Sequence, residues 1–559
     1  MSQVQFASTA GNSRSTRFNL FLAASSGALL GFAFPPSPMY TLAYVAFIPF
    51  FILLERVETY RHLLRYSFIF LFVFHLITLY WTGGWTHGRD GWLMTSNAAL
   101  LLTHPFFYMP SILLSFFVKR YLGLGPGLAA FSFLWIGYEY SHSIGEFSFP
   151  WITIGNSQAY DLSRAQIVEY SSTYGLSFFI LAFNSVSYFL LLKLSSNEWR
   201  LKSRQSLFAI GILLLVYVGP LIYGSIVRSS EMREKPSTAL HVGLIQPNID
   251  PWEKWGEGFA SKWDSYRSQF GRYLNESRKI SASSPDLILW PETAIPFPIL
   301  VSRFTAELPR LHHLIDSIGI PLLTGLHHLE YSDSAHATVT SQKVAPGLFV
   351  ESFNSLVLVE PGQRISRVYK KTVLVPFAER IPYAETFRFL IEPLKWNVGI
   401  SSWGKGMDTI VYSIATRKGY TVKFSGMICY ESVYPNFVRE FVRNGAEFLA
   451  VITNDSWWGN TSGTYQHAAF ASFRAIENRR WVVQCANGGI SEIVDPFGNI
   501  VTSSQMYTEA NMVSRIEARR ELTFYTRHGD VFALACLFCS AVMVILAFVE
   551  KFKKSEQHE

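Results

Sequence analysis

Long stretches without charge are the feature that most limits how this chain can fold. Seven stretches of the 559-residue sequence contain no Asp, Glu, Lys or Arg: 18–54, 66–88, 91–118, 121–138, 170–192, 205–227 and 531–549. A membrane-spanning helix needs about 20 mostly apolar residues. The first stretch is long enough for two helices, and Pro35-Pro36-Ser37-Pro38 interrupts it, which favours a hairpin. The sequence therefore predicts eight spans. A cleaved signal peptide over residues 14–34 is a less favoured alternative, because a second span follows at once.

The basic residues indicate the orientation of these spans. With the N-terminus in the cytoplasm, the inner segments contain 14 Lys and Arg residues, whereas the short outer loops contain only Arg89 and Arg164. Of the net charge of +7, +5 lies within residues 1–223, the most apolar part of the chain. The positive charge is therefore assigned to membrane topology and not to nucleic-acid binding.

The segment between the seventh and eighth predicted spans has the pattern of a separate α/β domain. Strand-like runs alternate with amphipathic stretches. The strand candidates include 239–247, 286–290, 320–325, 354–360, 366–370, 423–429, 447–453, 481–486 and a hairpin over 490–502, and the helix candidates are 258–281, 301–318, 434–444 and 464–480. We expect an N-terminal membrane domain of seven helices over residues 1–223, an outer domain over 224–530, an eighth span over 531–549 and a cytoplasmic tail over 550–559.

Three chemically active side chains of the outer domain follow strand-like runs. They are Glu292, Lys371 and Cys429. Ligand sites in open α/β sheets favour the carboxyl ends of strands, so the three can meet at one edge. A carboxylate can take the proton of a thiol, and an ammonium can stabilise an oxyanion. Taken singly, each residue has an ordinary structural role: a packed cysteine, a capping glutamate or a solvated lysine.

Other titratable side chains receive no catalytic role. The four cysteines lack metal-type spacing. A disulfide between Cys429 and Cys485 is a less favoured alternative, because Cys429 has a better use as a nucleophile. His75 and His104 fall in or near spans, where we expect neutral histidines packed between helices.

The local motifs resemble those of the nitrilase, or carbon–nitrogen hydrolase, superfamily, and in particular its membrane branch, the apolipoprotein N-acyltransferases. The contexts are Trp290-Pro291-Glu292-Thr293, Tyr369 to Glu379, Ile428-Cys429-Tyr430-Glu431, Thr453-Asn454-Asp455-Ser456-Trp457-Trp458-Gly459, Gln466-His467 and, in the membrane part, Phe149-Pro150-Trp151. The resemblance covers nearly the whole chain. It implies an α-β-β-α sandwich on the outer face of an eight-span helical bundle.

The resemblance also implies roles for individual residues. Glu292 is similar to the family's general base, Cys429 to the nucleophile and Lys371, eight positions before Glu379, to the catalytic lysine. Four supporting residues are implied as well: Glu379, Tyr430, Glu431 and, near a lipid entrance, Trp255. The chain departs from the usual motif at Val373 and Ala378, which leaves the detail of that loop open.

The activity implied is acyl transfer through a Cys429 thioester in the bacterial inner membrane, with the outer domain on the periplasmic side. The donor would be a phospholipid, with phosphatidylethanolamine the first choice, and the acceptor a diacylglyceryl apolipoprotein; no metal or organic cofactor is implied. Residues 383–396 and the pair Trp457-Trp458 are expected to form mobile arms at the membrane interface. The alternative is a membrane-tethered nitrilase-type amidase acting on a small carbon–nitrogen substrate.

Overall fold

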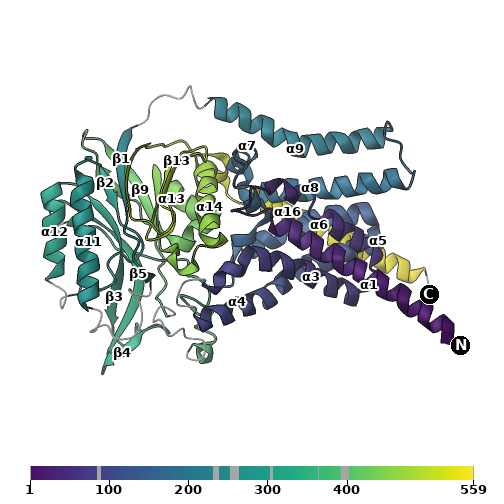
Figure 1. Cartoon of the computed structure of the whole chain (residues 1–559), viewed down its shortest axis with the longest axis horizontal. Coiled ribbons are helices and arrows are strands. Elements are labelled where there is room, and N and C mark those ends of the chain that lie inside the picture. Colours follow the sequence, from purple (N-terminus) through teal and green to yellow (C-terminus); the bar gives the residue numbers. More distant parts are fainter. Residues whose placement is uncertain are drawn as a thin grey trace.

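The computed structural model describes residues 2–84, 90–230, 238–251, 263–301, 306–362, 364–391 and 402–557. It has a helical part, which holds both ends of the chain, and a sheet-rich part at the opposite end (Figure 1). The main helices of the helical part are α1 (Ser2–Gly31), α2 (Ile48–Arg56), α3 (Tyr60–Leu79), α4 (Gly91–Thr103), α5 (Pro105–Leu122), α6 (Leu124–Ser141), α7 (Leu162–Ala165), α8 (Val168–Ser195), α9 (Arg204–Ser230), α15 (Phe524–His528) and α16 (Val531–Glu556).

Five helical segments of the described chain are long and apolar enough to cross a membrane. They are Tyr60–Gly83, Gly91–Leu122, Val168–Ser195, Arg204–Ser229 and Val531–Glu556. A helix satisfies its backbone N–H and C=O groups by hydrogen bonds within itself, as the hydrocarbon core of a bilayer requires. The chain is a membrane protein, and the number eight stays a prediction.

The predicted hairpin over residues 18–54 differs from expectation in its second arm. After α1, the chain forms a 3₁₀ turn at Tyr40–Tyr44 and then the nine-residue helix α2. Nine helical residues rise about 14 Å, roughly half the thickness of a hydrocarbon core. α2 therefore cannot cross a bilayer by itself.

Two other boundaries also differ from expectation. The predicted span over residues 91–118 is divided between α4 and α5 at Pro105, which occupies the first turn of α5, where a missing N–H is tolerated. The predicted tail over residues 550–559 continues as helix to Glu556, with Lys553 and Lys554 in the last turn, where cations are favourable.

The sheet-rich part contains two sheets. The first has the order β14-β1-β2-β3-β5-β4, with β6 and β7 paired to β5, and the second has the order β13-β12-β11-β10-β9-β8. The strands are β1 (Ala239–Gln246), β2 (Leu287–Leu289), β3 (Leu322–Ser332), β4 (Gln342–Ala345), β5 (Leu348–Glu360), β6 (Arg364–Ile365), β7 (Tyr369–Lys370), β8 (Tyr412–Ala415), β9 (Thr421–Ile428), β10 (Phe448–Thr453), β11 (Val482–Ala486), β12 (Glu492–Val494), β13 (Ile500–Ser503) and β14 (Ala510–Glu517).

Helices cover the outer faces of both sheets. α11 (Trp263–Ser281) and α12 (Glu307–Ile318) lie on the first sheet, and α13 (Pro435–Arg443) and α14 (Ser462–Asn478) lie on the second (Figure 1). The predicted α-β-β-α sandwich is confirmed in this arrangement. Parallel strands covered on both faces are buried throughout, as β10 and β11 are. α13 and α14 face the helical part, so the nucleophile side of the sandwich is the side that meets the membrane helices.

Candidate active site

Strand ends bring the three predicted catalytic side chains together. Glu292 follows β2, Lys371 follows β7 and Cys429 follows β9. The Lys371 Nζ lies 3.4 Å from Oε1 of Glu292 and 2.8 Å from Oε1 of Glu379. Only 1% of the surface of Lys371 and 8% of that of Cys429 is exposed. The three side chains therefore lie near one another and near Glu379, but not at one sheet edge as predicted, because Glu292 and Lys371 follow strands of the first sheet whereas Cys429 follows a strand of the second.

Burial and neighbouring charges set the protonation of this group. Burial disfavours the ammonium of Lys371, but Glu379 and Glu292 outweigh it and raise the pKa of Lys371 above its usual value. Burial, together with the negative charge of Glu292, raises the pKa of the Cys429 thiol well above its usual value, although Lys371 opposes this. The lysine is therefore charged and the resting thiol protonated, so the thiol needs a base when it reacts.

Asn354, in β5, aligns two members of the group. Its side-chain Nδ2 donates to Oε1 of Glu292 at 2.6 Å, and its backbone carbonyl accepts from the Lys371 N–H at 2.8 Å. Glu379 closes the following loop, because its Oε2 accepts from the Val375 N–H at 2.8 Å. The departures Val373 and Ala378 lie in this loop, and neither replaces a polar contact of Lys371.

Glu431 ties the lysine segment to the nucleophile turn. Its Oε1 accepts from the Thr372 N–H at 2.6 Å, the Val373 N–H at 3.1 Å and the Tyr369 hydroxyl at 2.7 Å, and its Oε2 accepts from the Ile428 N–H at 2.7 Å. Burial raises the pKa of Glu431 to about 7, against these donors and Lys371, which favour the carboxylate. This buried side chain thus links the segments that present Lys371 and Cys429.

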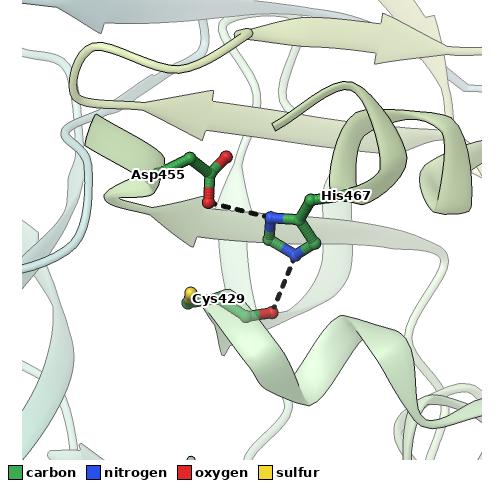
Figure 2. A group of neighbouring side chains, drawn as sticks. All are labelled: Cys429, Asp455 and His467. Atoms are coloured by element: carbon green, nitrogen blue, oxygen red, sulfur yellow. Dashed lines mark hydrogen bonds and ion pairs between the residues drawn. The ribbon is translucent and has the colours of Figure 1, made fainter. Parts of the chain in front are cut away.

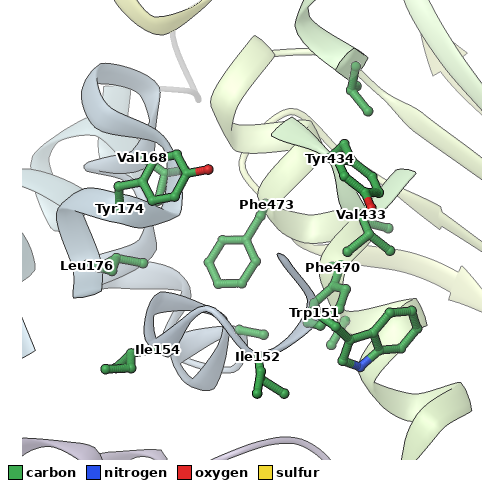
Figure 3. Close-up of a cluster of buried hydrophobic side chains, with 14 of the residues drawn as sticks. Trp151, Ile152, Ile154, Val168, Tyr174, Leu176, Val433, Tyr434, Phe470 and Phe473 are labelled. Atoms are coloured by element: carbon green, nitrogen blue, oxygen red, sulfur yellow. The ribbon is translucent and has the colours of Figure 1, made fainter. Parts of the chain in front are cut away.

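Tyr430 connects the nucleophile turn to the helical part. Its hydroxyl donates to the Ser148 carbonyl at 3.2 Å and accepts from Tyr434 at 3.0 Å, and its ring stacks with Trp151 at a centroid distance of 6.3 Å. Figure 3 shows apolar side chains from both parts of the molecule meeting beside these residues: Trp151, Ile152, Ile154, Val168, Tyr174, Leu176, Val433, Tyr434, Phe470 and Phe473. One continuous core therefore supports the active-site turn and the membrane helices.

Two further residues reach the nucleophile turn without a predicted role. His467 lies on α14 and Asp455 follows β10, and Figure 2 shows both beside Cys429. Possible ligand atoms of these three residues lie within 4.8 Å of one another. However, the His467 ring nitrogens face Asp455 on one side and Ser432 and the Cys429 carbonyl on the other. The group is therefore assigned to a hydrogen-bond network. The motifs that contain Asp455 and His467 are visible in the sequence. The contact between His467 and Cys429 could not be predicted from it, because the two residues are 38 positions apart.

The structure also tests the predictions for the cysteines and for the two histidines of the membrane part. Cys429 and Cys485 are both free thiols, so the disulfide alternative is wrong. His75 and His104 are buried, as expected, and the His75 Nε2 lies 2.7 Å from the His104 Nδ1. Trp255 lies outside the described residues.

The two proposed arms differ in their surroundings. In the described part of 383–396, Phe389 is 72% exposed, and Tyr383 packs against Phe147 at the end of the helical part, with ring centroids 5.3 Å apart. Trp458 instead packs against Trp81, with ring centroids 4.6 Å apart. The first segment thus lies beside the membrane helices, and Trp458 is part of the junction core.

Comparison with known proteins places this architecture in a family. The apolipoprotein N-acyltransferase N-terminal domain matches residues 26–186, and the carbon-nitrogen hydrolase domain matches residues 241–520. An apolipoprotein N-acyltransferase from Chlorobaculum tepidum is 33% identical over 537 residues, which cover 95% of this chain and 97% of that protein. The chain belongs to the apolipoprotein N-acyltransferase family.

A second family member shows the same extent of similarity. The apolipoprotein N-acyltransferase of Geobacter metallireducens is 30% identical over 540 residues, covering 96% of each chain. Among solved structures, an amidase from Nesterenkonia sp. is 15% identical, with a TM-score of 0.37, and covers 55% of this chain and 99% of that one. That likeness is too small to add to the family assignment, which rests on the full-length relatives.

Proposed function

We propose that this protein transfers a fatty acyl chain from a membrane phospholipid, through a thioester on Cys429, to the α-amino group of an N-terminal diacylglyceryl-cysteine in lipoproteins. Membership of the apolipoprotein N-acyltransferase family supports the reaction. The structural observation that carries it is the buried Lys371 ammonium between Glu292 and Glu379, next to a protonated thiol. Phosphatidylethanolamine is the proposed donor.

In the first step, the Cys429 sulfur attacks the ester carbonyl of the phospholipid while Glu292 accepts the thiol proton. The negative charge that develops on the carbonyl oxygen is stabilised by the Lys371 ammonium and the backbone N–H of Tyr430. The carbon–oxygen bond to the glycerol then breaks, Glu292 returns the proton to the leaving oxygen, and a lysophospholipid departs.

In the second step, the lipoprotein amine attacks the thioester carbonyl. Glu292 takes a proton from the attacking nitrogen, the carbon–sulfur bond breaks, and the proton returns to the Cys429 sulfur. An amide and the free thiol result. Water has to be excluded during this step, because it competes with the amine for the thioester.

The bilayer supplies both substrates in one plane. We propose eight spans, formed by α1, the segment from Tyr40 to the end of α2, α3, the pair α4–α5, α6, α8, α9 and α16, in the bacterial inner membrane with residues 224–530 on the periplasmic side. The basic residues of the predicted inner segments support this orientation. Trp255 is proposed to lie at the lipid entrance, and the aromatic segment 383–396 to contact the membrane interface.

The direct test is to trap the acyl-enzyme. Purified full-length protein is incubated with phosphatidylethanolamine labelled in its acyl chain, quenched in acid and mapped by mass spectrometry. We expect the label on Cys429, and its transfer to the amine of a diacylated lipopeptide added afterwards. Lys371→Ala should reduce the acylation rate about 100-fold or more, because the charge that stabilises the oxyanion is removed.

Matched variants make the result specific. Cys485→Ala should keep the label that Cys429→Ala loses, because Cys485 is buried in β11 away from Lys371. Lys370→Ala should acylate normally, because Lys370 pairs with Glu330 at the surface. Discharge by water as fast as by the lipopeptide would support the amidase alternative and contradict the proposed transfer.

A further inference from the structure

The nucleophile occupies a backbone conformation that has to be held in place. Cys429 has φ 52°, in the left-handed region, immediately after the last residue of β9. For a residue with a side chain this conformation costs about 1–2 kcal/mol. Contacts to the Cys429 peptide itself must therefore stabilise the turn, since the strand ends before it.

Two donors converge on the Cys429 carbonyl. The Ser432 hydroxyl donates to this oxygen at 2.8 Å, and the His467 Nε2 lies 3.2 Å from it. The dashed line in Figure 2 runs from the imidazole to the carbonyl oxygen and not to the sulfur. His467 therefore acts on the backbone of the nucleophile and leaves its thiol to Lys371 and Glu292.

Asp455 sets the orientation of the imidazole. Its Oδ1 accepts from the His467 Nδ1 at 2.9 Å and from the Thr453 hydroxyl at 2.7 Å. Because a carboxylate only accepts, Nδ1 carries a hydrogen. The Ser432 hydrogen is committed to the Cys429 carbonyl, and the Ser432 oxygen lies 2.9 Å from Nε2, so Nε2 carries a hydrogen as well. The side chains of Asp455 and His467 are both 0% exposed, so the protein fixes the imidazole without the help of solvent.

We propose that His467, oriented by Asp455, is a positioning residue that holds the Cys429 carbonyl and thereby keeps the thiol turned toward Lys371 and Glu292. The inference rests on the proposed role of Cys429 as the nucleophile. It assigns a function to His467 and Asp455, for which the Glu292, Lys371 and Cys429 group gives no role. His467 touches no reacting atom in this arrangement, and its effect passes through the backbone.

Three substitutions at position 467 separate positioning from simple packing. His467→Gln keeps a donor near the place of Nε2, His467→Asn keeps one only near Nδ1, and His467→Ala keeps neither. We expect Asn and Ala to lower the acylation rate constant about 10- to 100-fold at saturating phosphatidylethanolamine, with the donor KM within twofold, because the thiol is misplaced. Gln should recover most of the rate.

A second readout needs no lipid substrate. The rate at which iodoacetamide alkylates Cys429 should fall in the Asn and Ala variants and recover in Gln, because the thiol loses its place beside Lys371. If the wild-type protein forms no acyl-enzyme, the proposed function fails, while the alkylation series still tests the positioning role. The matched control is His312→Asn, which changes another buried histidine, in α12, and should leave both rates unchanged.

Two outcomes would overturn the inference. One is acylation and alkylation in His467→Ala within twofold of the wild type. The other is an equal loss of rate in the Gln, Asn and Ala variants, which would show that donation to the Cys429 carbonyl is not what His467 provides. Since Gln and Asn are close in size to histidine, they carry the test if the Ala variant fails to fold.

Discussion

At the scale of single residues, the candidate active site combines a charged lysine with a protonated thiol, and both are buried. Lys371 is held between two carboxylates, and the Cys429 pKa is raised by burial and by Glu292. A thiol that is protonated at rest is protected from adventitious reaction. In the proposed mechanism, Cys429 becomes a nucleophile only when its proton moves to Glu292 as a carbonyl carbon approaches.

This arrangement predicts how Cys429 alkylation depends on pH. Iodoacetamide should react slowly at pH 7, with a midpoint of the rate profile above pH 9. Lys371 lowers the Cys429 pKa, so Lys371→Met should move the midpoint to still higher pH, whereas Lys370→Met should not. Alkylation is measured at Cys429 by mass spectrometry. A downward shift in Lys371→Met would contradict the electrostatic assignment.

Glu431 predicts the acid side of the activity profile. Its carboxylate accepts from four donors, and its pKa is raised to about 7, so protonation below that pH removes acceptors from the nucleophile turn. The acylation rate should fall as the pH decreases through about 7. Glu431→Gln should acylate at least about 10-fold more slowly, because an unsatisfied buried donor costs about 1–3 kcal/mol. Its rate should also show no decrease near pH 7, because the titrating carboxylate has been removed. The exposed control Glu330→Gln should keep the wild-type pH profile. If the rate of Glu431→Gln still decreases near pH 7, a group other than Glu431 causes that decrease.

At the scale of elements, α14 joins the sandwich to the membrane helices. One side of the helix lies on the second sheet, and the other contacts the helical part. Most of its polar side chains are therefore buried, and some are paired: Arg474 forms an ion pair with Glu477 at 2.8 Å, and the Ser172 hydroxyl donates to Glu477 at 2.7 Å. A helix that looks half polar in sequence is in this case almost wholly internal.

Gln466 is the residue of α14 whose loss we expect to be most damaging to this junction. Its Oε1 accepts from the indole N–H groups of Trp151 at 2.7 Å and Trp81 at 3.2 Å, and its Nε2 donates to the Pro35 carbonyl at 3.0 Å. Gln466→Leu removes the partner of the Trp151 indole N–H and of the Pro35 carbonyl, whereas Trp81 keeps its hydrogen bond to the Thr78 carbonyl at 2.8 Å. The substitution should destabilise the protein by about 2–4 kcal/mol. Thermal unfolding in detergent should show a lower midpoint. Gln342→Ala, on the exposed strand β4, is the control, and equal midpoints for the two variants would exclude this role.

At the scale of the whole molecule, the sandwich lies at one end and both chain termini at the other (Figure 1). The turn between α8 and α9 also lies at the end away from the sandwich (Figure 1). If the long apolar helices cross a bilayer, the catalytic side chains face one compartment and the termini the other. The positive-inside rule then assigns the sandwich to the outer compartment.

Cysteine labelling tests this topology. Single cysteines are introduced as Ser334→Cys, in the exposed turn after β3, and Ser196→Cys, in the exposed turn after α8. A membrane-impermeant maleimide applied to spheroplasts should label position 334 and reach position 196 only after the membrane is disrupted. The reverse pattern would contradict the proposed orientation.

The residues of the candidate site could be selected from the sequence because each of them follows a local strand pattern. Glu292, Lys371 and Cys429 each follow a predicted strand, and the ends of these strands lie close together although they belong to two different sheets. The sequence predicted a spanning helix where the structure has the short helix α2. An uncharged stretch indicates apolar surroundings, but it does not indicate at which residue a helix begins. β14 was missed because its inward and outward side chains alternate only weakly, and its partner β1 lies at the other end of the domain sequence.

The role of His467 could not be read from the chain for a different reason. Its partner is a backbone carbonyl, which every residue possesses, so no side-chain pattern marks the contact. Asp455 and His467 are also twelve positions apart and belong to different elements. Such networks follow from the packing of α14 on the second sheet, which only the three-dimensional structure specifies.

Because Trp151 and Ser148 contact Tyr430, the geometry of the candidate active site should depend on the thickness of the bilayer. Ser148 and Trp151 lie in the connection that follows α6, so the helical part of the protein supports one side of the turn at Cys429. Helices tilt when their apolar length and the hydrocarbon thickness differ. A change in host lipid length can therefore shift that side of the turn relative to Lys371, so turnover should respond to the surrounding bilayer even when the acyl donor is kept the same.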